Sequence, residues 1–107
     1  MSKIKPLDSR VRTFGYRLGA QSPRSAALKV RYEAEELVAS FDETYQTPDR
    51  CLNEAADVLI TLIGYLYRSG VSWKRLVRVA NAKMAVNESR VWVTQPDGTY
   101  QHRKDEG

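Results

Sequence analysis

Four acidic side chains stand in two pairs of equal spacing, and they are the residues of this sequence best suited to chemistry. Glu33 and Glu36 form one pair, and Glu54 and Asp57 form the other. Residues three apart share one face of a helix, so each pair presents its two carboxylates together. Four carboxylates with no His or Cys among them make a site for a hard cation, Mg²⁺ or Mn²⁺ rather than zinc.

Each pair also has a purely structural interpretation. An ExxE spacing is common on solvated helix faces, which would account for Glu33 and Glu36. Glu54 and Asp57 lie in the apolar stretch LNEAADVLITLIG, where an unpaired charge is costly and a salt bridge to Arg or Lys is the alternative to a metal. The equal spacing on two neighbouring helices favours the metal site, because an antiparallel hairpin can bring all four carboxylates together.

A second group of polar residues follows further along the chain. Lys83, Asn87 and Arg90 are spaced at i, i+4 and i+7, which places them in one stripe on a helix. Two cations and an amide in line suit phosphate oxygens, with a solvated face as the alternative. Trp92 could stack on a base, although a packing role also fits.

The elements that must position these residues are helices. An apolar stripe at helical spacing predicts a first helix, and the Ser22-Pro23 and Thr47-Pro48 pairs are typical helix starts. The second helix is apolar almost all round and should be central, ending at Gly70. The alternating tail breaks at 96–98 and predicts a small hairpin. The fold class is therefore an all-α, oligomeric bundle of three main helices, at about residues 23–41, 48–69 and 73–90, with a short hairpin-like C-terminal tail.

Length and composition indicate a single domain over residues 1–107. It comprises a basic N-terminal segment (1–22), for which a loop and a short helix around 9–18 both stay open, the helices, and a tail (91–107). The lone Cys51 suits a reducing compartment, and no apolar run approaches the ~20 residues of a membrane span. With no secretory signal visible, we expect a cytoplasmic protein without membrane contact.

The net charge of +4 hides an uneven distribution. Basic residues dominate 1–31 and 58–92, whereas acidic residues dominate 32–57. A basic chain can indicate a nucleic-acid partner. Acids concentrated between two basic blocks suit a combined metal and phosphate site at least as well.

The order of these residues resembles the all-α nucleoside triphosphate pyrophosphohydrolases, the MazG-like proteins, with dimeric dUTPases and phosphoribosyl-ATP pyrophosphohydrolases as relatives. Their signature is EExxE, a gap, then ExxD, and KVRYEAEEL followed by NEAAD is similar to it. The first glutamate falls on Tyr32, which is a departure. KMAVNESRVW followed by DGTYQH resembles the C-terminal signature of phage and prophage dATP/dGTP pyrophosphohydrolase-like domains.

The resemblance implies a Mg²⁺-dependent hydrolase, with Mn²⁺ possible, that converts a (deoxy)nucleoside triphosphate and water to the monophosphate and pyrophosphate. It implies that the four carboxylates bind metal, with Glu33 or Glu36 acting on the attacking water. Lys83, Asn87 and Arg90 would contact phosphates, and Trp92 is a candidate for the base. A homodimer or homotetramer is also implied.

Three alternatives stay open. Tyr32 suggests a catalytically impaired, nucleotide-binding regulator, and the basic charge suggests a small helical nucleic-acid-binding protein, although nucleic acid is the less favoured partner. Phosphoribosyl-ATP is a third, less favoured choice, as substrate.

Overall fold

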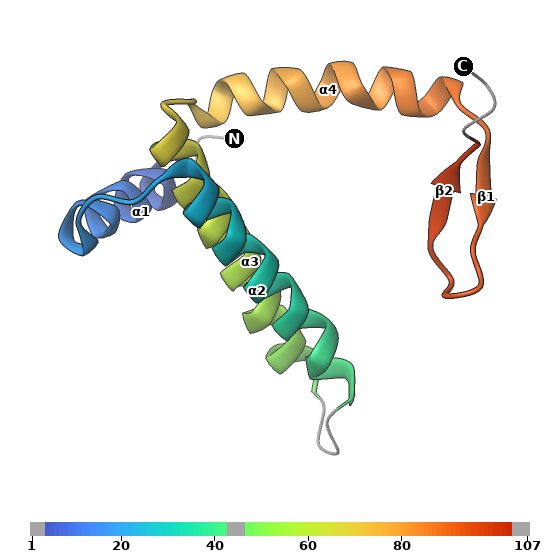
Figure 1. Ribbon diagram of the computed structural model, residues 1–107, viewed down its shortest axis with the longest axis horizontal. Helices are drawn as coiled ribbons and strands as arrows, with labels where there is room; N and C mark the ends of the chain where they lie inside the picture. The colour runs from blue at the N-terminus through green and yellow to red at the C-terminus, as the bar shows by residue number, and fades with distance from the viewer. Residues whose placement is uncertain (1–3, 43–46, 104–107) are drawn as a thin grey trace. The chain divides into compact units, whose positions relative to one another are not determined.

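The computed structural model describes residues 4–42 and 47–103, which divide into two compact units, Met1–Trp73 and Lys74–Gly107. The described residues contain four α-helices, a short 3₁₀ segment and one small hairpin (Figure 1). Parts of the predicted N-terminal segment and tail (1–3 and 104–107) lie outside the described residues. Among the described helices, none combines the length and apolar character needed to cross a membrane.

The first unit is built on an antiparallel pair of helices, α2 (Pro23–Ala39) and α3 (Pro48–Ser69) (Figure 1). Both starts are as predicted: the Ser22 hydroxyl accepts the Ser25 amide at 3.1 Å, and the Thr47 hydroxyl accepts the Arg50 amide at 3.2 Å. A proline follows each cap. Helix α3 ends at Gly70, whose φ of 70° is readily adopted by glycine.

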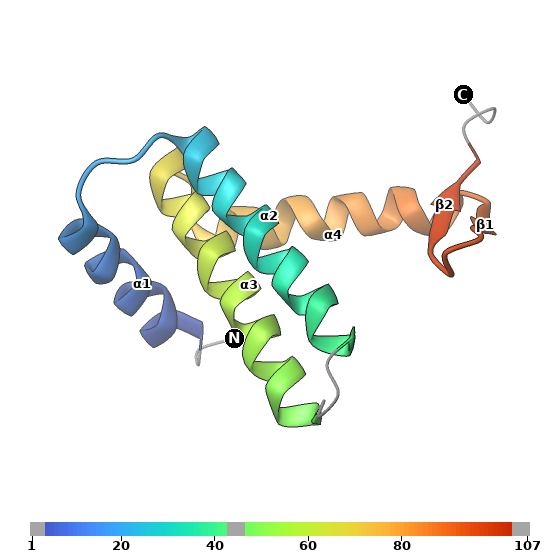
Figure 2. The same cartoon turned by 60° about the horizontal axis from the view of Figure 1, so that its bottom comes forward.

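A fourth helix, α1 (Ile4–Leu18), precedes the three predicted ones, so the helix left open for the N-terminal segment does form, and it begins earlier than the expected 9–18. Its apolar residues Leu7, Val11, Phe14 and Leu18 recur at helical spacing. The helix ends before Gly19, which has a φ of 87°. In Figure 2, α3 lies between α1 and α2, so its predicted central place within this unit is confirmed.

The core of the first unit forms where these three helices meet. Val11 of α1, Ala26 of α2, and Ile63 and Leu66 of α3 are buried. Beyond α2, the 3₁₀ segment Ser40–Asp42 carries a buried serine, whose hydroxyl donates to the Leu37 carbonyl at 2.6 Å. The same hydroxyl lies 3.3 Å from the Cys51 sulfur, which links the end of α2 to the start of α3.

The second unit consists of most of α4 (Trp73–Ser89) and a hairpin of β1 (Trp92–Thr94) and β2 (Tyr100–His102). The strands are antiparallel, with Trp92 opposite His102. Gly98 has a φ of 89° in the connecting turn, so the predicted break at 96–98 and the hairpin are confirmed. The all-α class is also confirmed, since the only sheet in the described residues is this two-stranded one. The single domain and the packing of the third predicted helix on the other two stay predictions.

Candidate metal and nucleotide site

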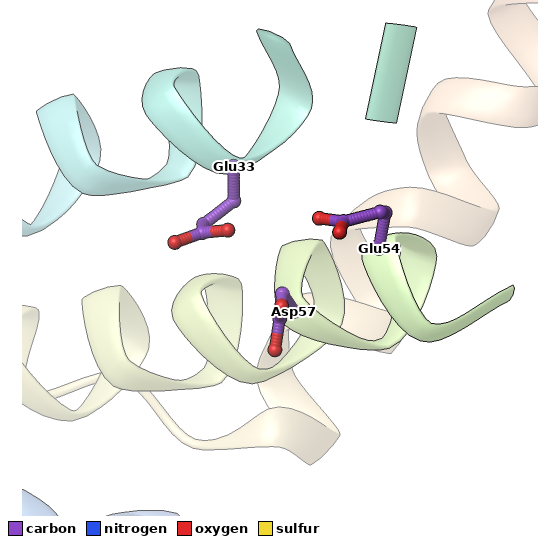
Figure 3. Close-up of side chains that lie close together, drawn as sticks. All are labelled: Glu33, Glu54 and Asp57. Atoms are coloured by element: carbon purple, nitrogen blue, oxygen red, sulfur yellow. The ribbon is translucent and has the colours of Figure 1, made fainter. Parts of the chain in front are cut away.

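Three of the four predicted carboxylates meet between α2 and α3. Glu33, Glu54 and Asp57 each place one carboxylate oxygen within 4.8 Å of the others. Figure 3 shows Glu33 extending from α2 toward α3, which carries the other two residues. The antiparallel hairpin therefore brings Glu33 of the first pair close to both members of the second pair.

The three residues differ in burial. Glu33 and Glu54 are half-buried, and Asp57 is exposed. The Glu33 side chain is only 16% exposed, so a solvated helix face does not describe it. The group thus combines two partly desolvated carboxylates with one at the water boundary, from which a ligand can approach.

Glu36, the fourth predicted ligand, is exposed on α2 and is not a member of the three-residue group. One helical turn from Glu33, it is still close enough for its charge to act on Lys29. Its part in metal binding or in catalysis stays a prediction.

Lys29 is the residue of this group that the sequence reasoning missed. Its ammonium lies 2.9 Å from Glu33 Oε1, one helical turn away on α2. The hydrogen bond to Glu33 and the charge of Glu33 raise the pKa of Lys29, and the charges of Asp57 and Glu36 act more weakly in the same direction. The i, i+4 spacing of Lys29 and Glu33 was the available signal.

The donor set fits a hard divalent cation. All three side chains offer oxygen, and three like charges this close are unfavourable unless a cation offsets them. Lys29 supplies one positive charge against three negative ones. These three residues can therefore hold Mg²⁺ or Mn²⁺. In the structure, the ammonium group of Lys29 offsets part of their negative charge.

The predicted phosphate-binding residues lie in the second unit. Lys83 is exposed on α4, whereas Asn87 and Arg90 are half-buried near the end of that helix. The Trp92 indole donates to the Asn87 carbonyl at 2.7 Å, and its ring meets His102 edge-on at 5.8 Å between centroids. These contacts fix Trp92 against the last turn of α4. A joint site of these residues with the carboxylates stays a prediction.

This geometry defines a class of protein: a helical protein with a carboxylate site for hard cations. No protein-family model and no curated protein sequence matches the chain. The comparison with solved structures does find a match: the cyanophage S-2L MazG-like pyrophosphohydrolase, bound to dGDP and three catalytic Mn²⁺ ions per active site.

The similarity to this cyanophage enzyme covers 94% of the present chain and 96% of the other, with 27% sequence identity and a TM-score of 0.66. The chain therefore has the MazG-like fold in its phage type, as its motifs indicated. Its structural relative is a hydrolase that acts on nucleotide phosphoric anhydrides.

Proposed function

We propose that this protein is a divalent-cation-dependent (deoxy)nucleoside triphosphate pyrophosphohydrolase. The observation that carries the proposal is the meeting of Glu33, Glu54 and Asp57 across the α2–α3 hairpin. The MazG-like neighbour, bound to dGDP and Mn²⁺, supports the same assignment. The reaction is nucleoside triphosphate plus water to nucleoside monophosphate plus pyrophosphate.

In this proposal, Glu33, Glu54 and Asp57 hold Mg²⁺, for which Mn²⁺ can substitute. The bound cation would neutralise phosphate charge and favour attack by water. Glu36, which lies outside the three-residue group, is the residue that we assign to orienting or deprotonating the attacking water, with Glu33 as the alternative. Lys29 balances the charge of Glu33.

Residues of the second unit complete the assignment. Lys83, Asn87 and Arg90 would contact phosphate oxygens and stabilise charge that develops on the leaving pyrophosphate. Trp92, held against the last turn of α4, would contact the base. We propose a cytoplasmic location and a homodimer or homotetramer as the working assembly.

The test is product identification by ³¹P NMR after incubation with each common ribo- and deoxyribonucleoside triphosphate and Mg²⁺ or Mn²⁺. We expect a monophosphate and pyrophosphate, because cleavage falls between the α and β phosphates. Orthophosphate with a nucleoside diphosphate would overturn the proposal. Tight nucleotide binding without any pyrophosphate would instead support the impaired regulator suggested by Tyr32, a residue that is 49% exposed and directly precedes Glu33.

A further inference from the structure

Helices α1 and α3 line an open hollow of about 720 Å³ on the surface of the first unit. Asp57 and Ile60 line it from α3, and Arg10, Phe14 and Arg17 are among its lining residues from α1. Asp57 also belongs to the carboxylate group. The hollow therefore opens directly beside the candidate metal site, on the side where α1 lies along α3 (Figure 2).

The two arginines form one wall of this hollow. Arg10 and Arg17 are seven residues apart, almost two full turns, so they project from the same face of α1. Phe14 stands between them, and the Arg17 guanidinium lies 5.7 Å from the centre of its ring. Cations on the α1 side thus line the same open hollow as Asp57, the candidate metal ligand on the α3 side.

The ion pairs of α1 leave these two arginines available. Arg12 pairs with Asp8 at 3.7 Å and does not line the hollow. Within the part of the chain that the structure describes, neither Arg10 nor Arg17 forms an ion pair. A guanidinium group can donate two parallel hydrogen bonds to the oxygens of one phosphate. Arg10 and Arg17 are therefore suited to bind a phosphate that enters the hollow.

We infer that Arg10 and Arg17 bind phosphate groups of the substrate in this hollow, opposite the cation held by Asp57. The inference rests on the proposed function and adds residues of α1 to the site. Asp57 alone would repel a phosphate, so this binding depends on a divalent cation that offsets the carboxylate charge. The ligand class is a chain of linked phosphates with a divalent cation.

The test uses inorganic tripolyphosphate, which has no base or sugar, and measures its binding by calorimetry with and without Mg²⁺. The variants are Arg10→Gln and Arg17→Gln, with Arg12→Gln as the matched control on the same helix. Each of the first two variants should weaken Mg²⁺-dependent binding by about tenfold, the effect of losing a charge-assisted contact, and the control should leave it unchanged. Mn²⁺ binding without phosphate, followed by electron paramagnetic resonance, should persist in all three.

Equal tripolyphosphate binding by the parent and by the Arg10 and Arg17 variants would overturn the inference. Equal weakening of binding by Arg12→Gln would also overturn it, because it would indicate a general charge effect. A parent that does not bind tripolyphosphate with Mg²⁺ would overturn it as well. The proposed function is tested separately by pyrophosphate release. Tripolyphosphate binding through these arginines without hydrolysis of any nucleotide would refute that function and leave only the phosphate contacts of Arg10 and Arg17 standing.

Discussion

At the scale of single residues, the site is governed by the balance of charge around Glu33. Three carboxylates converge, and Lys29 is paired with Glu33, whose side chain is only 16% exposed. An ammonium and a divalent cation compete for the same Glu33 oxygen, because both are attracted to it. Lys29 therefore stabilises the metal-free site and opposes metal binding.

Replacing Lys29 with Met should change stability and metal affinity in opposite directions. The metal-free variant should lose about 0.3–0.5 kcal/mol of stability, the range for an i, i+4 ion pair on a helix. It should bind Mn²⁺ about two- to fivefold more tightly, since the competing charge is gone. Denaturant unfolding and Mn²⁺ titration measure the two effects.

The pH dependence of this variant follows from the raised pKa of Lys29. A group with a raised folded pKa stabilises the fold at all pH values below its unfolded pKa, about 10.4 for lysine. That contribution disappears as the pH rises through the folded pKa. The stability difference between parent and variant should therefore be constant near neutrality and close above about pH 10; a difference that persists there would contradict the charge explanation.

Lys83→Ala should impair catalysis and leave folding unchanged. The residue is exposed on α4, so its removal leaves no core group unpaired. Loss of one charge-stabilising contact lowers activity by ~10²-fold. Lys74→Ala is a matched control, because Lys74 lies nine residues earlier, on the opposite face of the helix. Unchanged kcat/KM in the Lys83 variant would remove this residue from the site.

At the scale of elements, the helix caps and the apolar stripes of the helices were predictable from the sequence, because both depend on residues close together in the chain. Ser22, Thr47 and Gly70 act locally, and the structure places all three as expected. The extent of α1 was not predictable, because glycine at position 15 argues against a helix unless another element requires it. That requirement comes from Tyr67, far away in sequence: a Cβ on Gly15 would lie 3.2 Å from its ring.

The position of the carboxylates could also be predicted only in part. The ExxE spacing places Glu33 and Glu36 on one face of α2, because that depends only on their separation in sequence. Which of the two approaches α3 depends on how α2 is rotated about its axis in the packed hairpin. In the structure Glu33 is the one that approaches α3, and the sequence of α2 alone does not predict this rotation.

Two glycine-to-alanine variants should separate close helix packing from helix propensity. A Cβ on Gly64 would lie 4.0 Å from Val11, an ordinary contact, so Gly64→Ala should stabilise the fold by about 0.5–1 kcal/mol. The same gain at Gly15 is opposed by Tyr67, whose ring is already held between Tyr16 and Arg68.

We therefore expect Gly15→Ala to be less stable than Gly64→Ala, as measured by urea unfolding. Loosening of α1 in the Gly15 variant should also expose amides of α1 to hydrogen exchange. Equal stabilisation by the two substitutions would show that α1 does not pack tightly on Tyr67.

At the scale of the whole molecule, metal binding should couple to stability. A cation that binds only the folded form adds RT ln(1 + [Mg²⁺]/Kd), ~2.7 kcal/mol at a hundredfold excess over Kd. The double variant Glu54→Gln/Asp57→Asn removes two ligands and two repelling charges. It should be inactive, at least as stable as the metal-free parent, and insensitive to Mg²⁺ in a thermal melt. A structural salt bridge would give the reverse: a parent that ignores Mg²⁺ and a variant that melts well below it.

The distribution of buried side chains bears on assembly. The buried hydrophobic residues of the described chain all lie in the first unit, and α4 has none. Val79, Met84 and Val86 of α4 are about half exposed, and both strands of the hairpin carry exposed aromatic or apolar side chains. A unit of this size has little core of its own, so covering these side chains on association would stabilise it.

We therefore predict self-association through the apolar side of α4. Light scattering or sedimentation at tens of micromolar should give a dimer or tetramer, and the melting temperature should rise with protein concentration, because association favours the folded state by mass action. Met84→Lys should weaken the assembly, because it places a charge on an apolar surface that association would bury. Arg78→Glu, a charge change at another exposed position of α4, should weaken it less and serves as the control. A monomer at this concentration, with a melting temperature independent of concentration, would show that the exposed face of α4 needs no second copy of the chain.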